Sequence, residues 1–196
     1  MQLARLHANL PLADLEFIKE NIGLSVQALF KDLALPGAVI ESLISDFRDC
    51  LKKIPLKPEN KFGGVDDLLI YLKSKNLKLG IATNKPTYLA KIALVQVEID
   101  KYFDSIVGAD NIEAKPNPAV ILENLRILGS NRLTTMMVGD RVEDILAAKR
   151  ASIRSIGVAQ GVHSMNSLIA ANADLVFSSM SEMYIEFRNG VDFENF

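Results

Sequence analysis

Three segments of this 196-residue sequence combine residue types that can bind a phosphorylated ligand. Thr83 and Asn84 follow the apolar segment LKLGIA, where a hydroxyl, backbone N–H groups and a helix N-terminus can hold a phosphate oxygen. The alternative is that Asn84 only caps the helix that follows. Lys115 lies between a loop and a helix that starts with proline, so it can present a fixed positive charge to the same ligand. A solvated loop lysine is the alternative there.

An acidic pair follows a second apolar segment, TTMMV. Gly139 allows a sharp turn, Asp140 then stands at the end of the predicted strand, and Asp144 lies one helical turn later on the same side. Two carboxylates placed in this way can hold Mg²⁺, which prefers oxygen ligands and keeps several waters. The alternative is a capping box in which Asp140 caps the helix and Glu143 occupies its third position.

Alternating helices and short strands must position these groups. Helices are predicted at 65–75 and 87–97, from Asn117-Pro118 to Gly129, up to about residue 151, near Ser164, and after a capping box at Ser179 and Glu182. Short connections between such elements are typical of a parallel sheet covered by helices, in which ligands bind at the carboxyl ends of the strands. The predicted strands are 77–82, 103–107, 134–138, 155–159 and 175–177.

The first sixty residues have a different pattern, with helical periodicity and no convincing strand. Apolar residues recur at helical spacing over 36–54, and Cys50 beside this stripe is expected to be a small core residue. Prolines then interrupt the pattern, and Gly63 and Gly64 follow as a hinge. We therefore predict a helical cap over 1–60 and an α/β core over 61–196.

Composition excludes several classes of protein. Lys and Arg number 22 against 24 Asp and Glu, which gives a net charge of −2 and disfavours a nucleic-acid partner. No apolar run approaches the roughly 18–20 residues of a membrane span, so no membrane partner is expected. One cysteine excludes an internal disulfide framework, and MQLARLHANL lacks the pattern of a secretory signal. A soluble, cytoplasmic protein is the expectation.

The order and spacing of the three segments say more than each segment alone. TNKP at 83–86, KPNP at 115–118 and VGDxxxD at 138–144 resemble motifs II, III and IV of the haloacid dehalogenase superfamily. The helical lid, FGGV at 62–65 and IRSIGV at 153–158 resemble its phosphoglycolate phosphatase-like branch. The resemblance covers about residues 11–180. It implies a Rossmann-like parallel sheet with helices on both faces and a small helical cap. A response-regulator-like receiver is disfavoured, because the acidic pair follows a late strand and a lid precedes the sheet.

The resemblance also implies a reaction and a role for each residue. Members of this family transfer a phosphoryl group to an aspartate and then hydrolyse the aspartyl-phosphate. At the matching positions, Thr83 and Asn84 would bind phosphate, and Lys115 would neutralise charge on the nucleophile and the phosphoryl group. Asp140 would ligate Mg²⁺, with Asp144 completing that site. The implied substrate is a small phosphorylated metabolite, and the cap would exclude water and select the leaving group.

The sequence departs from the family at motif I, a first strand ending in Asp-x-Asp-Gly-Thr that supplies the nucleophile. This motif is absent from the 196 residues. Three interpretations stay open: the chain starts inside the lid, residues 3–10 are a decayed motif with Arg5 and His7 in place of its acids, or Asp14 is the nucleophile. The function is then either Mg²⁺-dependent hydrolysis of small phosphomonoesters or, as the alternative, phosphate and Mg²⁺ binding or partner recognition by a non-catalytic remnant.

The absent motif has a structural consequence, since the family's first strand lies in the middle of the sheet. Without it, the strands before Thr83 and Asp140 would each leave backbone groups unpaired, at about 1–3 kcal/mol for each buried group. Residues 2–6, closure of the sheet, or another chain must then fill the position. Self-association through the open sheet is therefore expected.

Overall fold

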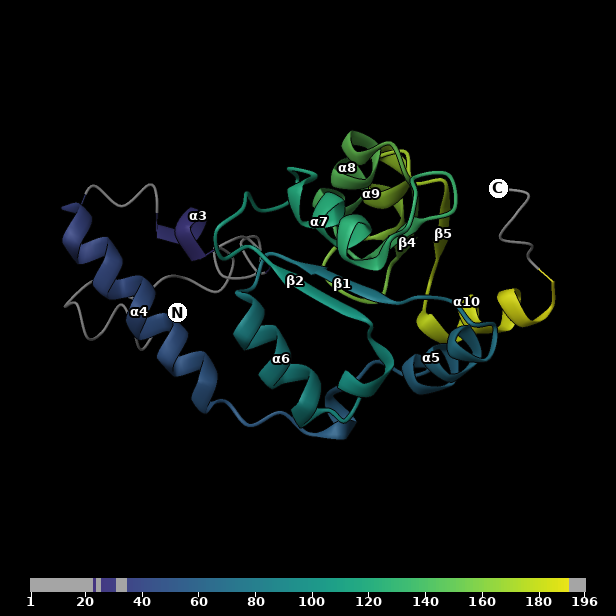
Figure 1. Cartoon of the computed structure of the whole chain (residues 1–196), viewed down its shortest axis with the longest axis horizontal. Helices are drawn as coiled ribbons and strands as arrows, with labels where there is room; N and C mark the ends of the chain where they lie inside the picture. Colours follow the sequence, from purple (N-terminus) through teal and green to yellow (C-terminus); the bar gives the residue numbers. More distant parts are fainter. Residues whose placement is uncertain (1–22, 24–25, 31–34, 191–196) are drawn as a thin grey trace.

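The computed structural model of the chain describes residues 23, 26–30 and 35–190, and it is an α/β fold (Figure 1). Its strands form two parallel sheets, one of two strands in the order β1-β2 and one of three in the order β3-β4-β5. The predicted parallel architecture is confirmed. The strands are β1 (Gly80–Thr83), β2 (Ser105–Gly108), β3 (Met136–Gly139), β4 (Arg154–Val158) and β5 (Leu175–Phe177).

Strand bounds differ from the prediction by up to three residues. The strand predicted at 77–82 begins only at Gly80, because Leu79 before it bonds mainly with Asp104, the residue that precedes β2. The Leu79 N–H donates to the Asp104 carboxylate at 2.8 Å, and the Leu79 carbonyl accepts from the Asp104 N–H at 2.8 Å. Asp104 therefore fixes where β1 and β2 both start.

The predicted helices are present, and the caps at Gly129, Ser164 and Ser179 follow the sequence signals. Ser164 accepts a hydrogen bond from the Ser167 N–H, and Gly129 ends its helix in the left-handed region at φ 59°. The box at the last helix is only half formed, since Glu182 accepts from Ser178 and not from the capping Ser179. These helices are α5 (Val65–Ser74), α6 (Thr87–Gln96), α7 (Ala119–Leu128), α8 (Val142–Ala151), α9 (Met165–Ala170) and α10 (Met180–Arg188).

Helices cover both faces of the strands. On the β1-β2 pair, α7 lies on one face and α6 on the other, while α8 packs on β3 and β4 (Figure 1). Because α7 and α8 also contact each other, one apolar core reaches from Val107 of the first sheet to Met137 of the second. A second core, between α5, α10 and the β3-β4-β5 sheet, contains Leu68, Ile156, Val158, Phe177, Met183 and Phe187.

The edges of β1 and β3 are the incomplete part of this architecture. Among the described residues, neither strand pairs with a neighbour on its second edge. β3 is half-buried throughout and β1 has no fully buried residue, whereas β2 and β4 are mostly buried. Among the described residues β2 also has one neighbouring strand, but it is covered by both α6 and α7. The predictions for residues 2–6, residues 3–10 and Asp14 lie outside the described residues.

The N-terminal part of the chain is helical where it is described, in α3 (Val26–Phe30) and α4 (Gly37–Lys53). Leu29, Phe30 and Leu43 form a small core of their own. The expectation that Cys50 is a core residue is wrong, because this residue of α4 is only half-buried. The short helix η1 (Pro58–Asn60) precedes α5, and the division at residues 60 and 61 stays a prediction. Within the described ranges, no helix is both long enough and apolar enough to cross a membrane.

Asp104 provides a test of how the first sheet is anchored. The Leu79 N–H and the Lys73 ammonium hold the pKa of this carboxyl below its usual value. A lowered pKa means that the stabilisation is present above the unfolded pKa of about 3.9 and is lost as the pH falls through the folded pKa. We expect Asp104→Ala to cost about 1 kcal/mol at pH 7, since the carboxylate is partly exposed and screened.

The measurement is thermal unfolding of both proteins at pH 7 and at about pH 3, where the difference should shrink. Glu186→Ala is the control, because this carboxylate lies exposed on α10. A destabilisation by Asp104→Ala that is equally large at both pH values would contradict the assigned role of the charge.

Candidate functional site

Lys115 is the centre of the candidate site. Its ammonium nitrogen lies 2.6 Å from Oδ1 of Asp144, and the two side chains are only 10% and 7% exposed. The same nitrogen donates to the main-chain carbonyl of Ala82 in β1, also at 2.6 Å. The alternative of a solvated loop lysine is therefore wrong. Lys115 therefore links the C-terminal end of β1, in the first sheet, to the first turn of α8, which packs on the second sheet.

Asn84 holds Lys115 from the other side. Its Oδ1 accepts from the Lys115 N–H at 2.7 Å, and its Nδ2 donates at 3.1 Å to the carbonyls of Lys115 and of Gly23. Asn84 does not cap α6, since Pro86 precedes that helix and no side chain caps it. Both amide hydrogens already have acceptors, so the geometry favours Asn84 as a positioning residue more than as a direct phosphate ligand.

Thr83 ends β1 directly before Asn84, at the carboxyl edge of the strand. Its hydroxyl oxygen accepts a hydrogen bond from the Lys85 N–H at 3.1 Å, which leaves the hydroxyl hydrogen able to donate to a ligand. The N-terminus of α6 is less open than the sequence predicts. The Thr87 N–H donates to the Asp110 carboxylate at 2.8 Å, and the Thr87 hydroxyl bonds the same oxygen.

Asp140 stands between β3 and α8, where the sequence predicts it. Its Oδ2 accepts from the Val162 N–H at 2.9 Å, and its carbonyl accepts from the His163 N–H at 3.2 Å. Only glycine fits opposite it, because a Cβ at Gly161 would overlap the carboxylate. Within the described part of the chain, no hydrogen bond to Oδ1 of Asp140 is present, so this oxygen can ligate a metal ion.

Asp144 has a different environment. Its Oδ1 is paired with Lys115, and its Oδ2 accepts from the Arg141 N–H at 3.2 Å. A Cβ at Gly139 would overlap this carboxylate, which explains the glycine that ends β3. The predicted capping box of Asp140 and Glu143 is wrong. The helix starts at Val142, so Arg141 is the capping residue and Asp144 is the third residue of the helix.

Two side chains that contact the first residues of α8, Arg141 and His163, were not singled out by the sequence. Arg141 is buried and donates from Nε and Nη2 to the two oxygens of Glu143, at 3.0 and 3.1 Å. His163 Nδ1 accepts from the Val142 N–H at 2.9 Å. Burial alone would raise the pKa of Glu143, but hydrogen bonds from Arg141 and the charges of Arg141 and His163 hold this pKa below its usual value. Nothing in the sequence distinguishes this arginine from an exposed one.

The donor set for a metal ion is small. The described residues contain no group of three or more His, Cys, Asp or Glu side chains that could hold a metal. The predicted carboxylates Asp140 and Asp144 are both present, but they have different hydrogen-bond partners. Asp140 keeps a free oxygen, whereas both oxygens of Asp144 are occupied by Lys115 and Arg141. Asp140 therefore fits a Mg²⁺ that keeps most of its ligands from water and substrate.

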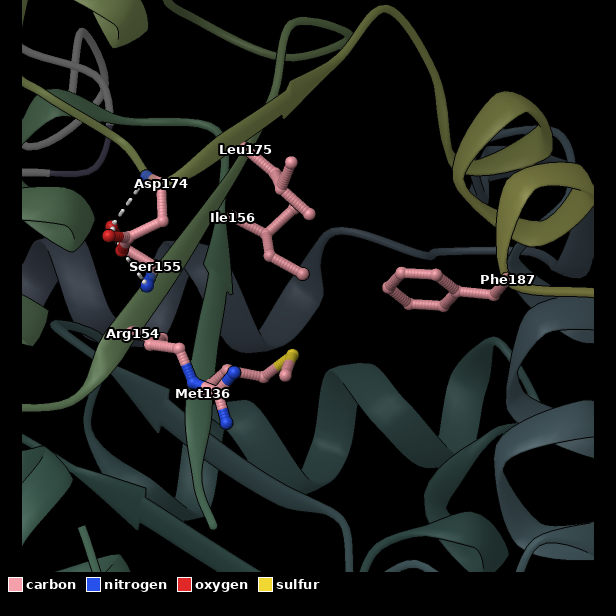
Figure 2. A pocket seen from close by; sticks show the side chains of 7 residues that line it. All are labelled: Met136, Arg154, Ser155, Ile156, Asp174, Leu175 and Phe187. Carbon is pink, nitrogen blue, oxygen red and sulfur yellow. Dashed lines mark hydrogen bonds between the residues drawn. The ribbon is translucent and has the colours of Figure 1, made fainter. Parts of the chain in front are cut away.

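The site lies at the carboxyl ends of β1 and β3, while a small pocket lies at the opposite end of the second sheet. Met136, Arg154 and Leu175, the first residues of β3, β4 and β5, line this pocket. Figure 2 shows Asp174 bonded to Ser155 on one side and Phe187 pointing toward the strands from α10. The pocket contains none of the predicted site residues, so it does not belong to the candidate site.

Comparison with known proteins agrees with this geometry. Residues 2–158 match the model of the haloacid dehalogenase-like hydrolase family. The chain belongs to this family. It is 34% identical over 183 residues to the probable phosphatase IndB of Dickeya dadantii (strain 3937). This match covers 89% of this chain and 79% of that protein.

Two further relatives extend the comparison. The phosphoglycolate phosphatase of Photorhabdus laumondii is 33% identical over 123 residues, so the match covers 62% of this chain and only 53% of that enzyme. The chain therefore spans about half the length of this relative. The crystal structure of a predicted phosphatase from Clostridium acetobutylicum superimposes with a TM-score of 0.81 at 25% identity, covering 96% of this chain and 88% of that one. The resemblance and the fold predicted from sequence are confirmed.

The buried pair of Lys115 and Asp144 leads to a stability prediction. Removing one partner leaves the other charge buried without compensation, which typically costs about 3–5 kcal/mol. We expect Lys115→Met to lower the free energy of unfolding by about 3 kcal/mol, and Asp144→Asn in the same chain to restore part of the loss. Urea unfolding at neutral pH measures both effects.

Lys52→Met is the matched control, because Lys52 pairs with Asp49 on the exposed surface of α4. Its effect should be much smaller than that of Lys115→Met. Equal effects of the two substitutions would show that Lys115 is not the buried link between the sheets.

Proposed function

We propose that this chain is a phosphatase-type protein that binds the phosphoryl group of small organic phosphomonoesters together with Mg²⁺. One observation carries the proposal: the buried Lys115 ammonium is fixed beside Thr83 at the carboxyl ends of the strands. An ammonium group has three hydrogens, and Asp144 and the Ala82 carbonyl take two of them. The third has no acceptor among the described residues and can donate to a phosphoryl oxygen, in a site where positioning and charge stabilisation dominate catalysis.

Each side chain has a distinct part in this proposal. The Thr83 hydroxyl donates to a phosphoryl oxygen, and Lys115 neutralises its charge. Asp144 and Asn84 orient Lys115. Asp140 holds Mg²⁺ through its free oxygen, and that ion, when bound, supplies further charge neutralisation at the phosphoryl group.

The relatives support the substrate class. One is described as a probable phosphatase and another as a phosphoglycolate phosphatase, both of the same family as this chain. We therefore propose small phosphomonoesters of the phosphoglycolate type as ligands. Hydrolysis in this family needs an aspartate nucleophile, and the 196-residue sequence has no Asp-x-Asp-Gly-Thr segment. This observation favours a second candidate function, phosphate and Mg²⁺ binding without catalysis.

The two candidate functions differ in turnover. Thr83, Lys115 and Asp140 can bind a phosphoryl group but cannot form the aspartyl-phosphate, so we expect residues 1–196 to hydrolyse p-nitrophenyl phosphate with Mg²⁺ no faster than the buffer does. Release of p-nitrophenol measures this. Robust turnover that Asp14→Asn abolishes and Glu16→Gln preserves would contradict the expectation and make Asp14 the nucleophile.

The metal prediction separates the two carboxylates. Mg²⁺ should bind weakly, because Asp140 offers one free oxygen and Asp144 is already engaged. Calorimetric titration with MgCl₂ should show binding that Asp140→Asn abolishes and that the exposed control Asp67→Asn leaves unchanged. Tight binding that survives Asp140→Asn would place the metal elsewhere in the molecule.

A further inference from the structure

Arg141 carries a buried nitrogen that the proposed chemistry does not use. The residue is only 7% exposed, and Glu143 occupies two of its three guanidinium nitrogens. The third, Nη1, is buried and has no hydrogen-bond partner among the described residues. Buried polar groups in folded proteins nearly always have a partner, and one that lacks it destabilises the fold. An unpaired buried guanidinium nitrogen at a candidate site therefore indicates that a ligand supplies the missing acceptor.

The position of Nη1 places it at the edge of the phosphoryl site. Arg141 stands between Asp140 and the first turn of α8, and its side chain packs against Gly23, where an added Cβ would come within 2.9 Å of Nη1. The carbonyl of Gly23 accepts from Nδ2 of Asn84, which in turn holds Lys115. With ordinary backbone dimensions, these contacts place Nη1 within about 10 Å of the Asn84 amide nitrogen. Arg141 and the Asn84 that holds Lys115 therefore have Gly23 as a common neighbour.

Glu143 fixes the orientation of Arg141 so that Nη1 can donate to a ligand. Its two oxygens hold Nε and Nη2 in a bidentate pair, so the guanidinium plane is fixed before any ligand arrives. The hydrogen bonds from Arg141 help to hold the pKa of Glu143 below its usual value against the effect of burial, so Glu143 is ionised at neutral pH and the pair persists. Three N–H hydrogens then remain, two on Nη1 and one on Nη2, and the pair on Nη1 requires an oxygen acceptor.

We propose that Nη1 of Arg141 donates to a carboxylate oxygen on the leaving group of the bound phosphomonoester. The inference rests on the proposed function, in which Lys115 and Thr83 face the phosphoryl group. Guanidinium–carboxylate hydrogen bonds are charge-assisted and stronger than those to neutral acceptors. Arg141 is then a specificity-determining residue that selects phosphate esters of small hydroxy acids over phosphate esters of simple alcohols.

The test compares two ligands of similar size that differ in the carboxylate. Phosphoglycolate, ethyl phosphate and inorganic phosphate are titrated calorimetrically into the full 196-residue chain in the presence of MgCl₂. We expect phosphoglycolate to bind at least about tenfold more tightly than ethyl phosphate, which is the range of one hydrogen bond between charged groups. In Arg141→Met and in Arg141→Lys this ratio should fall to about one, while the affinity for inorganic phosphate stays within about twofold.

Two controls make each outcome decisive. Arg126→Met removes an exposed arginine that is likewise paired with a nearby glutamate, and it should leave all three affinities unchanged. If Arg141→Met does not fold, Arg141→Lys, which keeps the charge but loses the planar fork, decides alone. A ratio near one in the wild type, or a ratio that survives both substitutions, overturns the inference while phosphate binding sustains the proposed function. Failure of the wild type to bind inorganic phosphate overturns both.

Discussion

The buried ion pair between Lys115 and Asp144 is the interaction on which the candidate site depends. In the described residues the two parallel sheets share no hydrogen-bond ladder, so strand pairing does not fix the distance between their carboxyl ends. The contact of α7 with α8 and the bonds of Lys115 to Asp144 and Ala82 do this instead. A buried pair is rarely the most stable solution for a core, but breaking it is costly. The same pair also orients the Lys115 ammonium, to which we assign binding of the phosphoryl group.

Close packing around the carboxylates is the second constraint. Gly139 and Gly161 stand where any side chain would overlap Asp144 or Asp140. The loop from β4 to α9 can therefore pack directly over the end of β3, and the Val162 and His163 N–H groups bond Asp140 there. Backbone donors from one loop and a lysine from another thus give the two carboxylates unequal surroundings. One keeps an oxygen for a ligand, and the other serves Lys115.

Asn84 and Arg141, at the edge of the site, differ in how many of their hydrogen-bond donors are used. Asn84 spends both amide hydrogens and its oxygen on Lys115 and Gly23, which leaves it saturated. Arg141 spends only two nitrogens, both on Glu143, and keeps the third. Both side chains contact Gly23, but Asn84 has no unused N–H donor, whereas Arg141 has. Of the two, only Arg141 is suited to donate to a ligand.

The sequence by itself determined the element order, the parallel α/β class, the caps at Gly129, Ser164 and Ser179, and the strand ends that carry Thr83 and Asp140. These follow from periodicity and local capping, which act within a few residues. Tertiary structure decided the burial of Lys115, the partners of Asn84, the start of α8 at Val142 and the buried state of Arg141. The states of Lys115, Asn84 and Arg141 each depend on a contact with a group more than twenty residues away. The carboxylate of Asp140 bonds the distant Val162 N–H instead of capping α8, and α8 starts at Val142. Local pattern carries no information about such contacts, because a lysine or an arginine has the same spacing signal whether it is solvated or enclosed.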